Sequence, residues 1–498
     1  MNSHTAPLQL KDNEAELILN YKLDKNGALK KRNGYELYAT NTLYHTSGLI
    51  STMYANNRIN YAWLTSNDGV FADATKRKTF YYKAADDTWT TTDDITQTPF
   101  DPVTGDADEV FKTRFVVFLN YVFRLNGGQG GAGDYPVSFL ITTPQTKTTT
   151  NLLYEDAAQI TFSPFLGTVY QARVFLNNSV DGYRSRIYYS TLGTSGGAIT
   201  WGISAAANTQ WRDINPDDGD FITAFEPRDD YMLIFKNFNL YKYYFDIPAI
   251  KIADVGTTSQ ESVKTNLDIG TTYFANPSGI YAYGGGKPKL ISGKIQEYVD
   301  AVTGANWNYC AGGVDKEHYY LSVGDITVNG RTITNAVFVY HIYLDAWTVY
   351  SLAEQPTVFT NIGTTFPTRF LSFGSGNGGV YKMTTSTSDI FGSSTVTNIN
   401  TEVLTKEHLL TFPEKTTLEN IDVMAIQGGD TKVSYQIDRN LLGREGDFVS
   451  CKERLNNRVN TCRVGKEMHT VRLRLSDNSQ RDSIIEGYNL EHTPKKSR

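Results

Sequence analysis

Arg114-Phe-Val-Val-Phe-Leu-Asn-Tyr-Val-Phe-Arg124 is the stretch of sequence that decides the fold. It is apolar and aromatic along almost its whole length, and Asn120 interrupts it in the middle. Short runs rich in β-branched and aromatic residues, broken by turn residues, are typical of strands. The stretch therefore predicts short strands separated by a turn.

The same pattern recurs from about residue 41 to residue 398, and long helical periods are nearly absent, with a short one possible at 293–302. Several segments share one order of apolar strand, turn, second apolar strand and polar turn. Their spacing of roughly 40–60 residues is in the range of one four-stranded propeller blade. We therefore predict an all-β fold with a β-propeller of six or seven blades. The repeating segments lie near 47–82, 112–142, 167–202, 220–246, 269–292, 307–350 and 357–383.

Changes in composition divide the chain further. Lys432-Val-Ser-Tyr-Gln-Ile-Asp438 alternates strictly between apolar and polar residues, which predicts strands with one wet face in a small antiparallel β-sandwich. A strand from the N-terminal arm is expected to complete the last blade and close the ring. The predicted order is an N-terminal arm (1–40), a β-propeller (41–383), a Ser/Thr-rich linker (384–398), a C-terminal β-sandwich (399–492) and a flexible basic tail (493–498).

Charge and cysteine content narrow the function classes. The formal net charge of -6 argues against tight wrapping of nucleic acid, although it permits DNA to pass close by. Cys451 and Cys462 are able to pair in principle, but with Cys310 they form an odd, sparse set, and we expect all three to be reduced in a cytosol. The N-terminus has no apolar core of the signal-peptide type. The longest apolar stretch, residues 115–123, is too short to span a membrane, so we expect no membrane insertion.

Three motifs resemble functional sites by their letters. Residues 128–133 match a dinucleotide fingerprint, but Asp-Tyr-Pro follows where a helix should begin. Residues 193–197 match a nucleophile elbow but lie in a Gly/Ser loop before a strand. Residues 213–220 resemble a calcium loop without the required Gly and Glu, so we interpret them as a solvated turn with a cation site as the alternative.

No catalytic, cofactor or metal site is predicted, and we expect a protein that is not an enzyme. None of the histidines has metal-ligand spacing, and His318 and His341 fall in strand-like stretches where we expect packing or surface residues. The repeated motif of sialidase-type propellers is absent from the sequence. The seven histidines are His4, His45, His318, His341, His408, His469 and His492.

Several stretches, in order, resemble the tail hub and nozzle proteins of short-tailed bacteriophages. The resemblance covers roughly residues 1–383, and the C-terminal region matches only in general style. The stretches are Asn13-Glu14 with Leu29-Lys-Lys-Arg-Asn-Gly34, Asp217-Asp-Gly-Asp-Phe-Ile-Thr223, Tyr231-Met-Leu-Ile-Phe-Lys236 with Asn239-Leu-Tyr241, Asn276-Pro-Ser-Gly-Ile-Tyr281, Lys287-Pro-Lys-Leu-Ile-Ser292, His318-Tyr-Tyr-Leu321, Val337-Phe-Val-Tyr340 and Asp345-Ala-Trp-Thr-Val-Tyr350.

The resemblance implies a structural virion protein, assembled in the host cytoplasm and located in the virion tail. Such subunits form a homo-oligomeric ring, expected to be six- or twelve-fold, below the portal and its adaptor. The ring would extend the DNA channel, retain packaged double-stranded DNA without reading its sequence, and anchor tail spikes, fibres or a needle. Lys30, Lys31 and Arg32 in the arm are the expected assembly contact with a neighbouring subunit or the adaptor.

Two other functions remain open from the sequence. One is a glycan- or receptor-binding propeller of a tail fibre, in which the aromatic side chains would stack on sugars. The other is a polysaccharide depolymerase, which would need clustered carboxylates on one face of the propeller.

Overall fold

The structure of the chain is a computed structural model, and most of the regular structure in its described residues is β, so the predicted all-β class is confirmed at the level of a mostly-β fold. Helices in the described residues are short: η3 (Pro216–Asp218), η4 (Gln260–Ser262), η5 (Ser292–Ile295), α1 (Gln296–Asp300) and α2 (Gly304–Tyr309). The structure describes residues 14–38, 46–53, 60–67, 77–83, 88–95, 114–125, 135–141, 147–148, 152–180, 182–193, 199–362, 370–375, 379–391, 395–410, 415–427, 430–437, 448–452, 454–455 and 458–494.

Five sheets each contain four strands that are consecutive in the sequence and pair antiparallel. The second strand in each case lies between two others, and in the fourth sheet residues 232–236 are buried throughout, because this strand is covered on both faces. The sheets are β5 (Thr46–Met53), β6 (Asn60–Asn67), β7 (Arg77–Lys83) and β8 (Thr88–Ile95); β9 (Arg114–Phe118), β10 (Tyr121–Leu125), β11 (Val137–Leu140) and β12 (Lys147–Thr148); β13 (Gly167–Tyr170), β14 (Arg173–Asn177), β15 (Arg186–Tyr189) and β16 (Trp211–Asp213); β17 (Ile222–Pro227), β18 (Met232–Lys236), β19 (Leu240–Tyr243) and β20 (Ile250–Ala253); β21 (Lys264–Asn266), β22 (Thr271–Asn276), β23 (Gly279–Tyr283) and β24 (Lys289–Leu290).

Two further groups of strands begin in the same way but are extended by strands from elsewhere in the chain. Four consecutive strands start a ten-stranded sheet, and three consecutive strands start a six-stranded sheet. The first group is β25 (Ala311–Val314), β26 (His318–Val328), β27 (Arg331–His341) and β28 (Ala346–Ser351), which continues into β1 (Ala15–Leu19); the second is β29 (Pro356–Ile362), β30 (Phe370–Ser375) and β31 (Val380–Met383), which continues into β4 (Tyr35–Leu37), β32 (Ser388–Phe391) and β33 (Thr395–Asn398).

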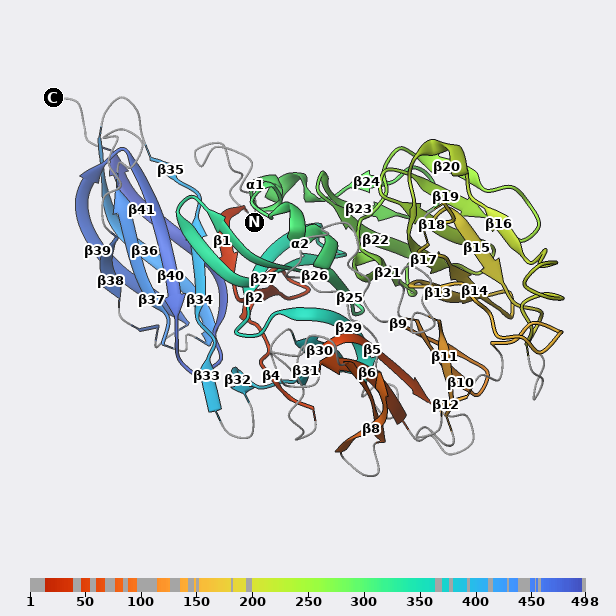
Figure 1. The fold of residues 1–498 in the computed structure, drawn as a ribbon. Helices are drawn as coiled ribbons and strands as arrows, with labels where there is room; N and C mark the ends of the chain where they lie inside the picture. Colours follow the sequence, from red (N-terminus) through yellow and green to blue (C-terminus); the bar gives the residue numbers. More distant parts are fainter. Residues whose placement is uncertain are drawn as a thin grey trace.

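The first strands of these seven groups lie next to one another in a series that returns to its start (Figure 1). β5 contacts β9, β9 contacts β13, and β13 contacts β17. β17 contacts η4, which leads into β21; β21 contacts β25, β25 contacts β29, and β29 contacts β5. Aromatic side chains pack between neighbouring groups, as in the Phe235–Phe274 and Tyr273–Tyr319 pairs, whose ring centroids lie 5.0 Å and 5.1 Å apart.

The strands after residue 400 form the C-terminal module, drawn in blue in Figure 1. Its strands lie in two sheets whose facing side chains share one core, including Ile421 and Val423 from one sheet and Leu473 and Leu475 from the other. One sheet contains β34 (Thr401–Thr405), β40 (Thr470–Asp477), β37 (Lys432–Ile437), β38 (Val449–Lys452) and the short β35 (His408–Leu409); the other contains β41 (Ile484–Pro494), β36 (Thr416–Gln427) and β39 (Val459–Met468).

The N-terminal segment, residues 14–38, pairs with strands of both regions. β1 lies between β28 and β34, so one ten-stranded sheet runs from the β25–β28 group into the C-terminal module. The hairpin of β2 (Tyr21–Leu23) and β3 (Leu29–Lys31) extends the other sheet of the module through β41. β4 pairs antiparallel with β31, in the position expected for an arm strand that completes the last strand group.

Two segments differ from their sequence-based expectations. Residues 384–398 contain β32 and β33, although their Ser/Thr content predicts a linker; β4 supplies a pairing partner, and tertiary pairing overrides local composition. Gly34 permits the chain to approach this region, because a Cβ atom there would lie 1.8 Å from the Ser388 carbonyl oxygen. Helix α2 was not predicted from the sequence. Its Trp307 is buried in the large hydrophobic core to which strands of the ten-stranded sheet also contribute.

Candidate functional site

The basic run Lys30-Lys31-Arg32 lies at the end of the β2–β3 hairpin, and two of its three side chains are buried. The Lys31 ammonium lies 3.4 Å from an Asp477 carboxylate oxygen, and both side chains are fully buried. The Arg32 guanidinium donates two hydrogen bonds, of 2.9 and 2.7 Å, to the two carboxylate oxygens of Asp389. Lys30 is half-exposed, 3.4 Å from Asp482.

The predicted assembly contact therefore needs correction for Lys31 and Arg32. Their partners come from distant parts of the same chain, and burial of both charges leaves neither side chain able to reach a neighbouring subunit. Burial lowers the pKa of Lys31, and the charge of Asp477 opposes this effect. For Lys30 an assembly role stays a prediction.

The calcium-like loop at residues 213–220 is folded around an internal cation, the ammonium of Lys236. This ammonium is fully buried and donates hydrogen bonds to Asp218 Oδ1 (2.6 Å), to the carbonyl oxygens of Asn215 (2.9 Å) and Asp220 (3.2 Å), and to Ser185 Oγ (3.1 Å). The oxygen-rich loop thus closes on a side chain from β18 rather than lying free in solvent as a turn.

The Asp218 carboxylate is the charged partner in this arrangement. Burial alone would raise the pKa of Asp218, but the hydrogen bonds from Lys236, from the Asp220 backbone and from Tyr241 outweigh it, and the pKa is lowered. The loop joins β16 to β17, so the ion pair ties the connection between two sheets to the second strand of the next sheet.

A pocket of about 390 Å³ lies where four turns meet. Lys25 comes from the β2–β3 turn, Asp268 from the β21–β22 turn, and Lys316 and Glu317 from the β25–β26 turn. His341 ends β27, and Tyr343 and Leu344 follow in the β27–β28 turn. The lining therefore combines two cationic and two anionic side chains with an aromatic ring, and we refer to it as the four-turn pocket.

The buried side chain of Asn266 and the partly exposed side chain of Asp315 hold the turns of this pocket in place. Asn266 donates from Nδ2 to the Asp315 carbonyl oxygen (3.1 Å) and accepts the Asp268 N–H at Oδ1 (3.0 Å), which joins the β21–β22 and β25–β26 turns. The Asp315 carboxylate accepts the backbone N–H groups of Glu317 (2.8 Å) and His318 (2.7 Å). These bonds fix the backbone before any ligand arrives.

A cross-strand histidine pair lies beside this pocket. His318 and His341 are directly opposite each other on β26 and β27, with ring centroids 4.8 Å apart. His318 Nδ1 lies 3.3 Å from Asp315 Oδ1, and His341 Nδ1 is 3.3 Å from the Leu344 backbone N–H, which donates to it. The buried Nε2 atoms of both rings have no hydrogen-bond partner within the described part of the chain.

The pKa shifts at this pair have clear causes. Burial lowers the pKa of His341, and the neighbouring His318 lowers it further. Burial would raise the pKa of Asp315, but its hydrogen bonds from His318, the Glu317 backbone and Tyr320 prevail, and the pKa is lowered. His341 is therefore neutral at neutral pH and adds no charge to the four-turn pocket.

Sequence patterns did not single out the four-turn pocket, because its residues come from turns far apart in the chain. Tyr343 was part of an apolar run expected to form a strand, and the structure places it in the β27–β28 turn with 59% of its surface exposed, although turns are usually polar. The dinucleotide-like residues 128–133 lie outside the described residues, as do residues 194–197 of the nucleophile-like motif.

The described residues hold neither a candidate metal cluster nor a membrane-spanning helix. Within the described ranges, no three His, Cys, Asp or Glu side chains come together as a possible metal site. No helix in the described part of the chain is long and apolar enough to cross a membrane.

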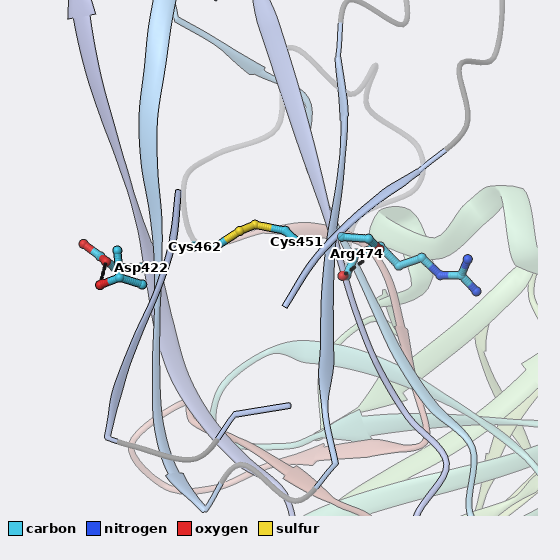
Figure 2. Close-up of a disulfide and its surroundings, with 6 residues drawn as sticks. Asp422, Cys451, Cys462 and Arg474 are labelled. Atoms are coloured by element: carbon cyan, nitrogen blue, oxygen red, sulfur yellow. Dashed lines mark hydrogen bonds between the residues drawn. A yellow bond between two sulfur atoms is a disulfide. The ribbon is translucent and has the colours of Figure 1, made fainter. Parts of the chain in front are cut away.

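The expectation that all three cysteines are reduced is wrong. Cys451 on β38 and Cys462 on β39 form a disulfide with a Cα–Cα distance of 5.8 Å, and Cys310 is a buried free thiol. Figure 2 shows the bond crossing between the strands, with Asp422 and Arg474 on either side. β38 and β39 are the last strands of the two different sheets of the C-terminal module, so the fold places the two cysteines face to face.

Comparisons with known proteins identify no family. No family model and no curated protein matches the sequence. Similar solved structures include an exo-β-1,3-galactanase from Phanerochaete chrysosporium (8% identity, TM-score 0.29, 93% of this chain and 100% of that one), BBS1N in complex with ARL6DN (12%, 0.37, 71% and 95%) and the AfRom2 CNH domain (7%, 0.39, 70% and 99%). At these TM-scores the similarities carry no argument about fold or function.

Proposed function

We propose that the seven strand groups are the blades of a seven-bladed β-propeller and that the C-terminal module is a β-sandwich. The closed series of first strands supports this architecture, because β29 lies against both β25 and β5. In this interpretation β4 is the fourth strand of the last blade, β32 and β33 continue the sheet beyond it, and the two ends of the propeller are joined by a strand from the N-terminus.

The proposed function of this architecture is a structural subunit of a short bacteriophage tail. The subunits form a hub or nozzle ring below the portal and adaptor, extend the DNA channel, retain the packaged genome and anchor tail spikes or fibres. The order of the resembling sequence stretches supports the proposal. Residues 231–236 fall on β18, residues 276–281 cover the turn from β22 to β23, and residues 345–350 fall on β28, so the stretches occur in successive strand groups.

The observation that carries this proposal is the way residues 14–38 join the two regions. β1, the β2–β3 hairpin and β4 each pair with different sheets, and the buried Lys31–Asp477 and Arg32–Asp389 ion pairs fasten the segment at two places. A ring repeats one interface until rotation closes it, so all of its subunits must keep the same shape. A subunit that also withstands the pressure of packaged DNA therefore needs a stiff connection between its two regions.

Quantitative mass spectrometry of purified virions tests the proposal. The copy number of this chain is measured relative to the twelve-fold portal that such phages are expected to carry. A ratio near one half or one is the expected result, because it corresponds to a six- or twelve-fold ring. A multiple of three per attachment point would assign the chain to a fibre instead, and absence from virions would overturn the tail proposal.

A further inference from the structure

The charged side chains that line the four-turn pocket are balanced in sign. Its two lysines, Lys25 and Lys316, are balanced by Asp268 and Glu317, and the Lys25 ammonium lies 3.5 Å from the Glu317 carboxylate. An anionic or cationic ligand would meet a charge of its own sign as often as an opposite one. A ligand with many hydroxyl groups can donate to the carboxylates and accept from the ammonium groups at once.

The aromatic side chain of the pocket is exposed but held in place. Tyr343 is 59% exposed at the β27–β28 turn, and its ring packs edge-on against His341 at a centroid distance of 6.4 Å. His341 in turn accepts the backbone N–H of Leu344, so this buried histidine is a positioning residue for the turn that carries the ring. An exposed, oriented aromatic face beside hydrogen-bonding groups suits a ligand with one apolar face and a polar edge.

The size and rigidity of the pocket fit the same ligand class. About 390 Å³ is at the lower end of the range for ligand pockets, which accommodates one or two sugar rings. The backbone bonds from Asn266 and Asp315 fix two of the four turns before binding, and preorganisation reduces the entropy cost of binding.

We propose that the four-turn pocket binds a neutral saccharide, with Tyr343 stacking on a sugar ring and Asp268 accepting its hydroxyl groups. This inference does not depend on the proposed tail ring, because the site would bind sugars equally in an isolated subunit. If the chain is part of a virion, the site would contact cell-surface polysaccharide. Lys25 makes the pocket depend on the N-terminal hairpin, because that turn supplies one of its walls.

The test uses the purified full-length chain on an array of neutral and carboxylated bacterial oligosaccharides, with free neutral disaccharides as competitors in saturation-transfer NMR. Wild-type protein should bind neutral glycans, and Tyr343→Ala and Asp268→Asn should each weaken binding at least tenfold. Tyr183→Ala is the matched control, because Tyr183 is 47% exposed away from the pocket, and it should bind as wild type does.

Three results would overturn the proposal: no neutral glycan bound by the wild-type protein, binding restricted to carboxylated glycans, or unchanged binding in either pocket variant. Competition by free disaccharides separates recognition of the sugar itself from adhesion to a polymer surface. Virion copy number is measured on different material, so failure of the ring proposal and failure of this one are distinguishable.

Discussion

Arg32 and Asp389 are 357 positions apart in the sequence, yet they form a buried, two-pronged ion pair with hydrogen bonds of 2.9 and 2.7 Å. Asp389 also accepts the backbone N–H of Tyr35, so it fixes the point at which β4 enters the six-stranded sheet. Asn20 adds to the same junction by accepting the Arg32 Nε–H (3.0 Å) and the Ser351 N–H (2.9 Å). The junction therefore joins the N-terminus, β28 and β32.

Removing one partner of this pair should be costly. We expect Asp389→Ala to lower the free energy of unfolding by about 3–5 kcal/mol, because Arg32 remains buried without a counter-charge. Urea unfolding followed by circular dichroism measures the change. Asp482→Ala, which removes the 26% exposed partner of Lys30, is the control and should cost less than Asp389→Ala does. Equal effects of the two substitutions would show that Asp389 does not fasten the N-terminal segment.

The internal cation of the 213–220 loop gives a second prediction. Lys236→Met preserves the length of the side chain but removes the ammonium from its four oxygen acceptors, and we expect a loss of about 3 kcal/mol. Lys251→Met is the control, since Lys251 is 45% exposed in its ion pair and should change stability by less than about 1 kcal/mol. Thermal unfolding of both variants measures the two losses of stability. A Lys236→Met protein as stable as the control would contradict the role of Lys236 as the internal cation of the loop.

The histidine pair predicts a dependence of stability on pH. Because the pKa of His341 is lowered on folding, the unfolded chain binds more protons below its usual pKa of about 6.5, and stability falls as the pH drops through and below that value. The lowered pKa of Asp315 acts at lower pH: its contribution is present above about pH 4 and is lost as the pH falls through the folded-state pKa.

Urea unfolding at pH 7.5 and pH 5.5 isolates the histidine contribution. His341→Gln should reduce the loss of stability between these two pH values, whereas His492→Gln, at an exposed position, should leave the loss unchanged. A wild-type protein equally stable at both pH values would disprove the assignment to His341.

The disulfide is expected to stabilise the C-terminal module. It closes a short loop between residues 11 positions apart, so reduction or Cys451→Ser should lower stability by about 3 kcal/mol. Thiol counting on the denatured protein provides the check. One thiol, from Cys310, is expected without reductant and three are expected with it; three thiols without reductant would mean that the pair is not formed in solution.

Local features of the fold were predictable from sequence, and long-range partners were not. The strand-turn-strand pattern at residues 114–124 became β9 and β10, because β-branched and aromatic residues and the turn residues between them act over a few positions. The same local information gave Lys31 and Arg32 as an assembly contact, since their partners Asp477 and Asp389 are hundreds of residues away and could not be paired with them from the sequence. The pairing of Cys451 with Cys462 depends on two sheets that face each other. The number and spacing of the cysteines in the sequence do not reveal that arrangement.

In the candidate site, too, local features were predictable from the sequence and long-range contacts were not. His318 and His341 were expected to be packing or surface residues in strands, and they lie against each other across β26 and β27. The four-turn pocket escaped prediction because Lys25, Asp268, Glu317 and Tyr343 come together only through the arrangement of separate turns.

The strand β1 has a mechanical consequence. It is registered with β34 at four residue pairs but with β28 at one, Leu19 opposite Val349. Part of a pulling load on the C-terminal module reaches the remaining sheets through this strand and the ion-paired junction beside it, and part through the Arg331–Glu402 ion pair. We expect the pairing between β1 and β28 to separate first under load, so that β1 stays paired with the C-terminal module. The mechanically weakest place in the protein would then lie between the strand groups and the C-terminal module, and both regions would stay folded when it separates.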